Sequence, residues 1–270
     1  MSARRRPPGP ARFRRDLALV AWQVLYEQRA FWRNRARAFF AFLFPIIFLV
    51  IFSAIFQSKR IYEGSGRSIS YDTFFVPGIL AYGVIATTYL NMAIGTAVLR
   101  DDGVLKRMAG TPLPGWAYVA ARVISTIIVT VLMSALTLAI GHFVYDTHVR
   151  GSTLPGLITT LALGSATFTA LGVALVRYIR NAEAAPAVVN ATVLPLTFIS
   201  GIWFHFKLSR TLVDIAKVFP VRPLADGLQH AFNPFTRGAG FVDSDLLTLA
   251  IWLVVGIVGM LRFLRDPGHA

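Results

Sequence analysis

The chain contains no cysteine, which excludes disulfide frameworks and thiolate metal sites. Negative charge is also scarce: 13 Asp and Glu stand against 27 Lys and Arg, giving a net charge of +14. In a soluble protein this charge would indicate nucleic-acid binding. Here the basic residues flank long apolar segments, so we predict anionic lipid headgroups as their partners and no nucleic acid.

The sequence also lacks the motifs of the common catalytic sites. It has no G-x-x-x-x-G-K-[ST], no H-E-x-x-H and no G-x-S-x-G. The five histidines are scattered without ligand spacing: His142, His148, His205, His230 and His269. No carboxylate interrupts the apolar segments, which disfavours an ion-coupled carrier. We therefore predict no catalytic, cofactor-binding or metal-binding residue in this chain, and an external source of energy for any transport.

Six long segments carry no Asp, Glu, Lys or Arg. They are Ala38–Phe56, Thr73–Val98, Val123–Ile140, Leu154–Val176, Ala187–Phe204 and Leu246–Leu261. About 20 apolar helical residues cross the hydrocarbon core of a bilayer, and a single charge at its centre is costly. The pattern predicts an all-α integral membrane protein with six transmembrane helices within residues 38–264.

The distribution of Lys and Arg predicts the orientation of these helices. Basic residues concentrate in residues 1–37 and recur in residues 99–122 and 177–186. The positive-inside rule places these segments, and both termini, in the cytoplasm. Residues 265–270 then form a short cytoplasmic tail, and the basic, proline-rich residues 1–10 are expected to be a disordered cytoplasmic tail.

Residues 11–37 have the pattern of an amphipathic helix. One face carries Leu17, Val20, Ala21, Val24 and Leu25, spaced as on a helix, while arginines and two tryptophans flank it. A basic helix with this apolar face is typical of the membrane interface. We predict that residues 11–37 lie in the inner interface, rather than in a soluble domain.

The connection between the fifth and sixth segments is too polar to span and too apolar for a free loop. An apolar stripe, Leu208, Leu212, Ile215, Val218 and Phe219, ends at Pro220, and "PLADGLQHAF" can form a second short helix. Two interpretations remain open. The helices dip back into the membrane, where other protein must cover them, or they fold as an outer loop on the headgroups.

Mild polar residues lie within two of the segments. The second segment carries Thr87 and Asn91, and the fifth carries Asn190 and Thr197. Such side chains commonly form hydrogen bonds between packed membrane helices. The other interpretation is that they line a weakly polar pathway.

The charged run "RDDGVLKRMAGTPLPGW", Arg100–Trp116, interrupts the apolar pattern between the second and third segments. By composition it is either a short amphipathic helix suited to a partner or a solvated turn. The run resembles the segment that joins spans two and three in ABC-2 family permeases, the membrane subunits of ATP-binding cassette exporters. The matching residues are Arg100, Asp101, Gly103, Leu105, Lys106, Arg107, Thr111, Pro112 and Leu113.

The second half of the chain is similar to the same family. "LPLTFISGIWFHF" resembles the family's fifth span and its "SG" exit, and "FPVRPLADGLQHAF" resembles its outer re-entrant segment. The permeases of the antibiotic- and multidrug-resistance type are the most similar. The resemblance implies an N-terminal interfacial elbow helix, six spans and outer re-entrant helices between spans five and six.

The resemblance also implies partners and site residues. Two permeases, identical or related, pair in the bilayer, and two separate ATPase subunits, which hold ATP and Mg, bind beneath them. The coupling loop would be formed by Arg100, Asp101, Asp102, Gly103, Leu105, Lys106, Arg107, Thr111 and Pro112. A second cytoplasmic contact would be formed by Arg180, Asn181 and Glu183. Spans two and five would line the pathway, which makes Thr87, Asn91, Asn190 and Thr197 candidate lining residues.

The expected function is therefore the permease subunit of an exporter in the bacterial inner membrane. It would move a hydrophobic or amphiphilic substrate (a drug, an antibiotic, a lipid or a glycan) outward, and would not itself be an enzyme. The alternative is a membrane scaffold or assembly factor that has the same fold without transport.

Overall fold

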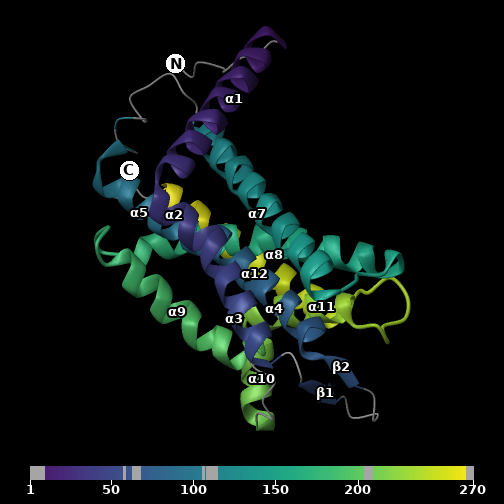
Figure 1. Ribbon diagram of the computed structural model, residues 1–270. Coiled ribbons are helices and arrows are strands. Elements are labelled where there is room, and N and C mark those ends of the chain that lie inside the picture. The colour runs from purple at the N-terminus through teal and green to yellow at the C-terminus, as the bar shows by residue number, and fades with distance from the viewer. Residues whose placement is uncertain are drawn as a thin grey trace, which may run out of the picture.

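The computed structural model describes residues 10–56, 59–62, 68–104, 107, 115–203 and 209–265. Its elements are α1 (Pro10–Arg33), α2 (Arg35–Ala38), α3 (Phe44–Phe56), β1 (Arg60–Tyr62), β2 (Ser68–Ser70), α4 (Tyr71–Ile85), α5 (Asn91–Asp101), α7 (Gly115–Tyr145), α8 (Leu154–Leu175), α9 (Ala185–Ile199), α10 (Arg210–Val218), α11 (Val221–Phe232) and α12 (Asp243–Arg265) (Figure 1). The π-helical stretch Phe39–Leu43 joins α2 to α3, and Ala86–Leu90 joins α4 to α5.

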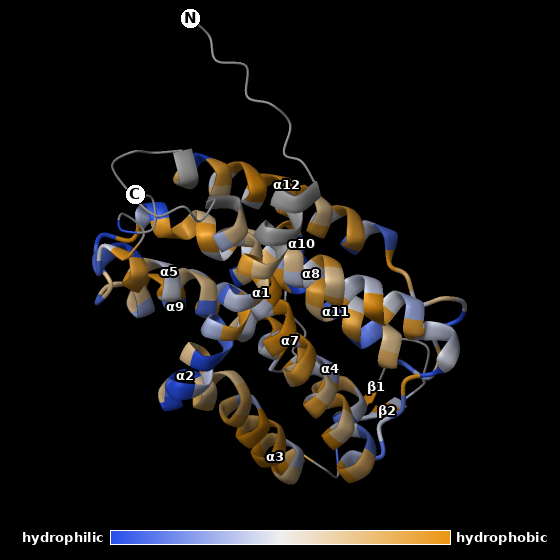
Figure 2. Cartoon of the chain, turned by 90° about the horizontal axis from the view of Figure 1, so that it is seen from above, coloured by the Kyte–Doolittle hydropathy of each residue, from blue (hydrophilic) through white to orange (hydrophobic). Residues whose placement is uncertain are grey.

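Within the described residues, five helical segments are long and apolar enough to cross a membrane. They are Arg35–Phe56, Tyr71–Asp101, Ala120–Tyr145, Leu154–Tyr178 and Asp243–Phe263. Each contains or largely overlaps one of the six predicted segments, so the structure confirms an all-α fold with at least these five candidate spans. Helices α3, α7 and α12 consist mostly of hydrophobic residues (Figure 2), and many of their large apolar side chains are exposed.

The helix of the predicted fifth segment is shorter than predicted at its outer end. Its helix, α9, has only 15 residues and ends at Ile199, followed by a turn through Trp203. Gly201 has φ of +74°, the left-handed conformation in which glycine commonly ends a helix. The prediction of one helix through Phe204 is therefore wrong beyond Ile199, and Phe204 itself lies outside the described residues.

The continuous helix formed by α4 and α5 is the centre of the fold. Its most apolar window is 89% buried, whereas that of α12 is 17% buried. Gly78, Gly83 and Gly95 lie along it. The backbone of Ile202 approaches Gly78, and the ends of the Met133 and Arg122 side chains approach Gly83 and Gly95. Small residues permit such close contacts between membrane helices, and they explain why this span is enclosed by the others.

Helix α1 packs on the first turns of α7 through a narrow stripe. Val20 is buried against Ala117 and Ala121. The prediction of a helix is correct up to Arg33, but the helix breaks at Asn34, whose side chain accepts a hydrogen bond from the N–H of Arg37 and begins α2. Asparagine is a favoured N-cap residue because it satisfies such unpaired donors.

A second group of apolar side chains on α1 faces outward. Leu25 of the predicted face is 51% exposed, beside the exposed Trp22, Tyr26 and Trp32. Aromatic side chains next to arginines are enriched where membrane meets water. The sequence therefore predicted the helix correctly. It placed Val20 and Leu25 on one apolar face, but in the structure Val20 packs against α7 and Leu25 is exposed.

A small β-hairpin between α3 and α4 was not predicted. Strands β1 and β2 pair antiparallel, with Ile61 opposite Ile69, and both side chains are buried. Ser70 then caps α4 by accepting a hydrogen bond from the N–H of Thr73. Three-residue strands are too short for their alternation to stand out in a sequence.

Helices α10 and α11 form a hairpin, which confirms the two predicted short helices. Along α11, the carbonyl of Ala231 accepts a hydrogen bond from Thr153 at the beginning of α8. At the other end of α11, Leu224 lies against Gly164, about halfway along α8. The first turn of α11 is therefore level with the middle of α8.

The turn between the two helices lies at the same depth. The indole N–H of Trp252, near the middle of α12, donates to the carbonyl of Val218 at 2.7 Å. Helix α10 ends at Val218, and α11 begins after Pro220. Proline disfavours the helical conformation of the preceding residue, so the chain reverses at Phe219–Pro220.

An ion pair stabilises α11 within this hairpin. The guanidinium of Arg222 donates to the carboxylate of Asp226 at 3.1 Å, and the side chains are 18% and 32% exposed. Removal of Arg222 would therefore leave the half-buried Asp226 carboxylate without this ion pair.

We expect Arg222→Gln to lower stability by about 1–2 kcal/mol at pH 7.5, because it leaves a half-buried carboxylate without its partner. The measurement is the thermal unfolding midpoint in detergent. The double variant Arg222→Gln/Asp226→Asn should lose less stability than Arg222→Gln alone, because it leaves no carboxylate without a partner. An equal loss in both variants would contradict this account.

Candidate functional site

Two connecting segments meet at one end of the helical bundle. The end of α5 lies against the segment that joins α8 to α9, and Arg100 makes the contact. Its guanidinium donates to the carbonyl of Val176 at 3.0 Å and to the carbonyl of Arg180 at 3.1 Å. The last carbonyls of a helix have no partner within the helix, and a cation near them is favourable. Arg100 therefore caps a helix far from it in sequence.

Asp101 completes this contact. One carboxylate oxygen accepts from the Arg100 guanidinium at 3.0 Å, and the other accepts from the backbone N–H of Ala182. The side chain of Arg100 is 13% exposed and that of Asp101 is 29% exposed. Since charge-assisted hydrogen bonds strengthen away from water, the adjacent pair Arg100–Asp101 holds the two segments together.

The turn after α5 requires glycine. Gly103 has φ of +67°, a conformation that is unfavourable for other residues. Its N–H donates to the carbonyl of Arg100 at 3.0 Å, and its carbonyl accepts from the N–H of Arg107 at 3.1 Å. The Arg107 guanidinium donates to the carbonyl of Asp102 at 2.8 Å. The turn is thus closed by its own residues.

The second segment is also ordered by a side chain. The Asn181 amide oxygen accepts from the N–H of Ala184 at 2.9 Å, an arrangement that commonly precedes a helix. Arg180 and Glu183 are exposed beside it.

We use the name two-turn surface for the exposed charged residues of both segments, Asp102, Arg107, Arg180 and Glu183. Sequence analysis treated the two segments as separate contacts and missed that Arg100 and Asp101 join them. Leu105, Lys106, Thr111 and Pro112, and most of the short helix expected after Arg100, lie outside the described residues.

The candidate pathway residues fall into two environments. Thr87 and Thr197 are fully buried. The Thr87 hydroxyl is 3.0 Å from that of Thr130 on α7 and bonds the carbonyl of Gly83 at 2.8 Å, so it faces α7 rather than α9. The Thr197 hydroxyl bonds the carbonyl of Leu194 within α9. Asn91 and Asn190 are half-buried.

A different pair joins the second and fifth predicted segments. The hydroxyls of Tyr89 and Thr192 lie 2.9 Å apart, between the π-helical stretch and α9. The sequence analysis passed over both residues, although Tyr89 and Thr192 are among the few hydroxyl groups in those segments. In the described part of the chain, no three His, Asp or Glu side chains lie close enough together to hold a metal ion.

Comparison with known proteins agrees with this architecture. Residues 19–233 match the family model described as ABC-2 type transporter. The chain is 23% identical over 218 residues to the inner membrane transport permease YadH of Escherichia coli K12, covering 79% of this chain and 81% of YadH. The YadH proteins of Escherichia coli O157:H7 and Shigella flexneri match equally well. The match includes α4, α5 and all residues of the two-turn surface.

Proposed function

Because the chain belongs to the ABC-2 type transporter family, we propose that it is the permease subunit of an ATP-driven exporter whose ATPase subunits bind at the two-turn surface. The observation that most directly supports this proposal is the contact of Arg100 and Asp101 with residues 176–182. A force applied at either turn is passed to both. Through them it reaches α5, which continues the central helix, and α8 and α9.

The proposed topology places the two-turn surface in the cytoplasm. The basic residues at this end of the bundle favour that orientation. Helix α1, with its exposed aromatic residues and arginines, then lies in the inner membrane interface as an elbow helix, and both termini are cytoplasmic. As with the relatives named inner membrane permeases, the location is the bacterial inner membrane.

We count α9 as the fifth of six spans, although its 15 residues extend only ~22 Å. The hydrocarbon core is about 30 Å thick. The remaining outer distance is covered by Gly201–Trp203 and by the α10–α11 hairpin, whose turn lies level with the middle of the spans. Irregular backbone is tolerated at this depth only when protein covers it, and the Gln229 side chain donates to the carbonyl of Gly201 at 3.0 Å. We therefore favour the re-entrant interpretation over the outer loop.

The working assembly has two permeases, identical or related, and two ATPase subunits that hold ATP and Mg. The described spans carry few charges, so the cargo is hydrophobic or amphiphilic: a drug, an antibiotic, a lipid or a glycan. The substrate passes between the two permeases. The half-buried Asn91 and Asn190 are therefore better placed to contact it than the fully buried Thr87 and Thr197.

The absence of native cysteine gives a direct test of the ATPase contact. We expect Asp102→Cys and Glu183→Cys to crosslink to a co-purifying cassette ATPase in native membranes with a short bifunctional thiol reagent. Gly151→Cys is the matched control, because Gly151 lies at the opposite end of α8 with open space around it. The readout is the crosslinked band, identified by mass spectrometry.

Each outcome is informative. An ATPase linked to both turns, and not to residue 151, supports the proposal. A cassette ATPase that co-purifies without linking to either turn would move the contact elsewhere. A permease that purifies without any cassette ATPase would contradict the exporter and favour a scaffold.

A further inference from the structure

Two arginine side chains from different helices converge on the central helix, near the end that carries the two-turn surface. Arg37 lies on α2, where the first span begins, and Arg122 lies near the beginning of α7. A Cβ at Gly95 of α5 would lie 3.1 Å from a terminal nitrogen of Arg122 and 3.4 Å from one of Arg37. The two nitrogens are therefore at most 6.5 Å apart, the sum of these distances.

The two charges are not neutralised by the described residues. Neither arginine takes part in an ion pair there, and Glu27 of α1 acts on Arg37 only from beyond ion-pair distance. The Arg122 guanidinium donates to the Tyr118 hydroxyl at 3.1 Å, whereas that of Arg37 donates to no described residue. Both arginines are half-buried. Because like charges repel and burial weakens their hydration, an anion between them is favourable.

The pair lies at the level where lipid headgroups meet the hydrocarbon core. Arg37 and Arg122 are each the third residue of a candidate span, and Gly95 lies six residues, or ~9 Å, before the end of another. Trp32 and Phe40 precede and follow Arg37 in the sequence and are 49% and 58% exposed. Exposed aromatic side chains are enriched at the membrane interface. A lipid headgroup is therefore a nearer ligand than an anion in solution.

The donors of the pair suit a phosphate. Each guanidinium is a planar fork that can donate two parallel hydrogen bonds to a phosphate. The hydrogen bond to Tyr118 restrains one fork, and Gly95 allows both forks to reach the same point on α5, since any side chain there would contact them. Two forks around one point offer more donors than the two oxygens of a carboxylate can use, so a phosphate uses the pair more fully.

We propose that Arg37 and Arg122 bind the phosphate of an anionic phospholipid from the leaflet on the side of the two-turn surface. The bound phosphate joins the first span to α7 across the central helix and offsets the repulsion between the arginines. A zwitterionic lipid binds less well, because its headgroup brings a cation towards them. The inference goes beyond the proposed transport function, because the site needs neither ATPase nor cargo.

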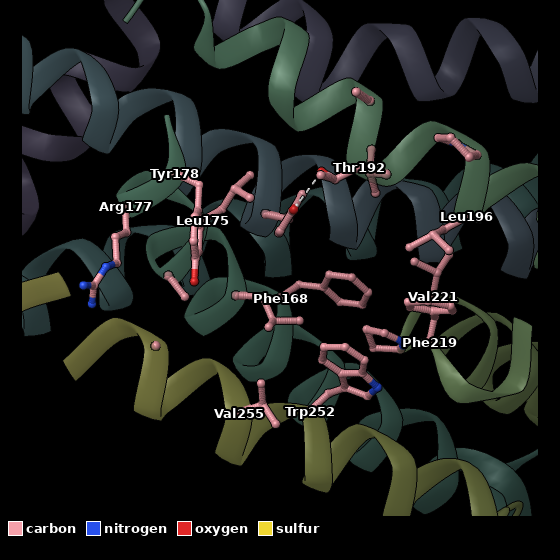
Figure 3. Close-up of a pocket in the computed structure, with 18 of the residues that line it drawn as sticks. Phe168, Leu175, Arg177, Tyr178, Thr192, Leu196, Phe219, Val221, Trp252 and Val255 are labelled. Carbon is pink, nitrogen blue, oxygen red and sulfur yellow. Dashed lines mark hydrogen bonds between the residues drawn. The ribbon is translucent and has the colours of Figure 1, made fainter. Parts of the chain in front are cut away.

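A separate cavity gives the test a competing site. It has a volume of about 860 Å³ and lies between α8, α9, α12 and the turn of the α10–α11 hairpin (Figure 3). Its walls are mainly apolar and include Phe168 and Trp252, and Arg177 and Arg262 also line it. A lipid could enter this cavity as well. Ala191→Phe places a large ring on its wall and so separates the two sites.

The test measures which lipid the purified full chain binds. The protein in detergent is mixed with equal amounts of phosphatidylglycerol and phosphatidylcholine, and the bound lipid is counted by native mass spectrometry. We expect about 10-fold more phosphatidylglycerol to bind, a preference of ~1.4 kcal/mol. The double variant Arg37→Gln/Arg122→Gln should bind the two lipids equally. The matched control Arg29→Gln/Arg33→Gln, which removes two exposed arginines from α1, should keep the preference.

Three further samples sharpen the result. Gly95→Leu keeps both arginines but places a side chain where they converge, so it should lower the preference at least 3-fold. Ala191→Phe should leave the preference unchanged. Millimolar glycerol phosphate, added to the wild type, should not release the bound phosphatidylglycerol, because it lacks the acyl chains that hold a lipid at this level of the membrane.

Several outcomes would overturn the proposal: equal binding of both lipids by the wild type, loss of the preference in the α1 double variant or in Ala191→Phe, an unchanged preference in Gly95→Leu, or full release by glycerol phosphate. If Arg37→Gln/Arg122→Gln does not fold, the single variants Arg37→Gln and Arg122→Gln should each lower the preference at least 3-fold. An unchanged preference in both would likewise overturn it. No cassette ATPase is present in any sample, so the result is independent of the exporter proposal.

Discussion

Arg100→Met is expected to lower ATP hydrolysis by the complex, or the amount of ATPase retained on the permease, at least 10-fold. The permease itself should still insert into the membrane. The variant keeps a long apolar stem but loses every donor. The carbonyl of Arg180 and one oxygen of Asp101 lose their partner, and the Val176 carbonyl keeps only the hydrogen bond from the N–H of Ile179. A hydrogen bond to a charged group contributes about 1.5–3 kcal/mol, and each ~1.4 kcal/mol is a factor of ten in an equilibrium constant. The two turns should separate as a result.

The measurement is ATP hydrolysis by the complex in vesicles, together with the amount of ATPase retained on the purified permease. Arg150→Met is the matched control. It removes an exposed arginine at the opposite end of α8, away from the two-turn surface. We expect less than a 3-fold change for this control, because exposed side chains contribute ~0.5 kcal/mol or less.

Arg100→Lys distinguishes charge from geometry. Lysine keeps a positive charge beside Asp101 but presents it at one point, so it cannot serve two carbonyls and a carboxylate as the planar guanidinium does. We expect most of the loss to persist in Arg100→Lys. Full activity in this variant would show that charge alone matters, and full activity in Arg100→Met would exclude the two-turn contact from coupling.

The sequence predicted the spans better than the contacts between them. Charge-free stretches such as Ala38–Phe56 identify helices that must be apolar along their length, because no charge is tolerated in the hydrocarbon core. The five corresponding helices are therefore present. Where apolar residues do not set the structure, prediction failed: Gly201 ends α9 early, and the three-residue strands Arg60–Tyr62 and Ser68–Ser70 leave no periodic signal.

The candidate site shows the same limit. Sequence patterns located both turns, and the glycine at position 103 is explained by its positive φ. The sequence pattern could not predict that Arg100 contacts the end of α8, 76 residues away. An arginine and an aspartate at the end of an apolar helix are equally consistent with a helix end exposed to solvent and with a contact to another segment. Only the packing of α5 on α8 brings the Arg100 guanidinium to the carbonyls of Val176 and Arg180, so that the Arg100–Asp101 pair joins the two segments.

A second large effect is expected from a single methyl group at Gly78. A Cβ at this position of α4 would lie 2.5 Å from the carbonyl oxygen of Ile202. That carbonyl belongs to the turn that ends α9, and the turn is fixed from several sides: Tyr71 donates to the carbonyl of Trp203 at 3.3 Å, and the Trp203 ring packs 4.9 Å from that of Tyr82. The backbone cannot move away without disturbing these contacts.

We therefore expect Gly78→Ala to lower the free energy of unfolding by about 1–3 kcal/mol, the usual range for overpacking a filled interior. Replacement of glycine by alanine within a helix otherwise stabilises it by up to ~1 kcal/mol, so a net loss reports the clash. The measurement is the thermal unfolding midpoint and the yield of monodisperse protein in detergent.

Two other glycines serve as matched controls. At Gly83, on the same helix, the atom nearest to an added Cβ is the terminal methyl of Met133 at 2.8 Å. Methionine has three flexible torsions and can rotate away, so Gly83→Ala should be close to neutral. At Gly151 nothing lies within 4 Å, and Gly151→Ala should also be neutral. Equal destabilisation at positions 78 and 83 would mean that helix contacts in general, rather than the fixed turn at Ile202, limit the packing of α4. A loss confined to position 78 would show that the early end of α9 is held in place by its contact with the central helix.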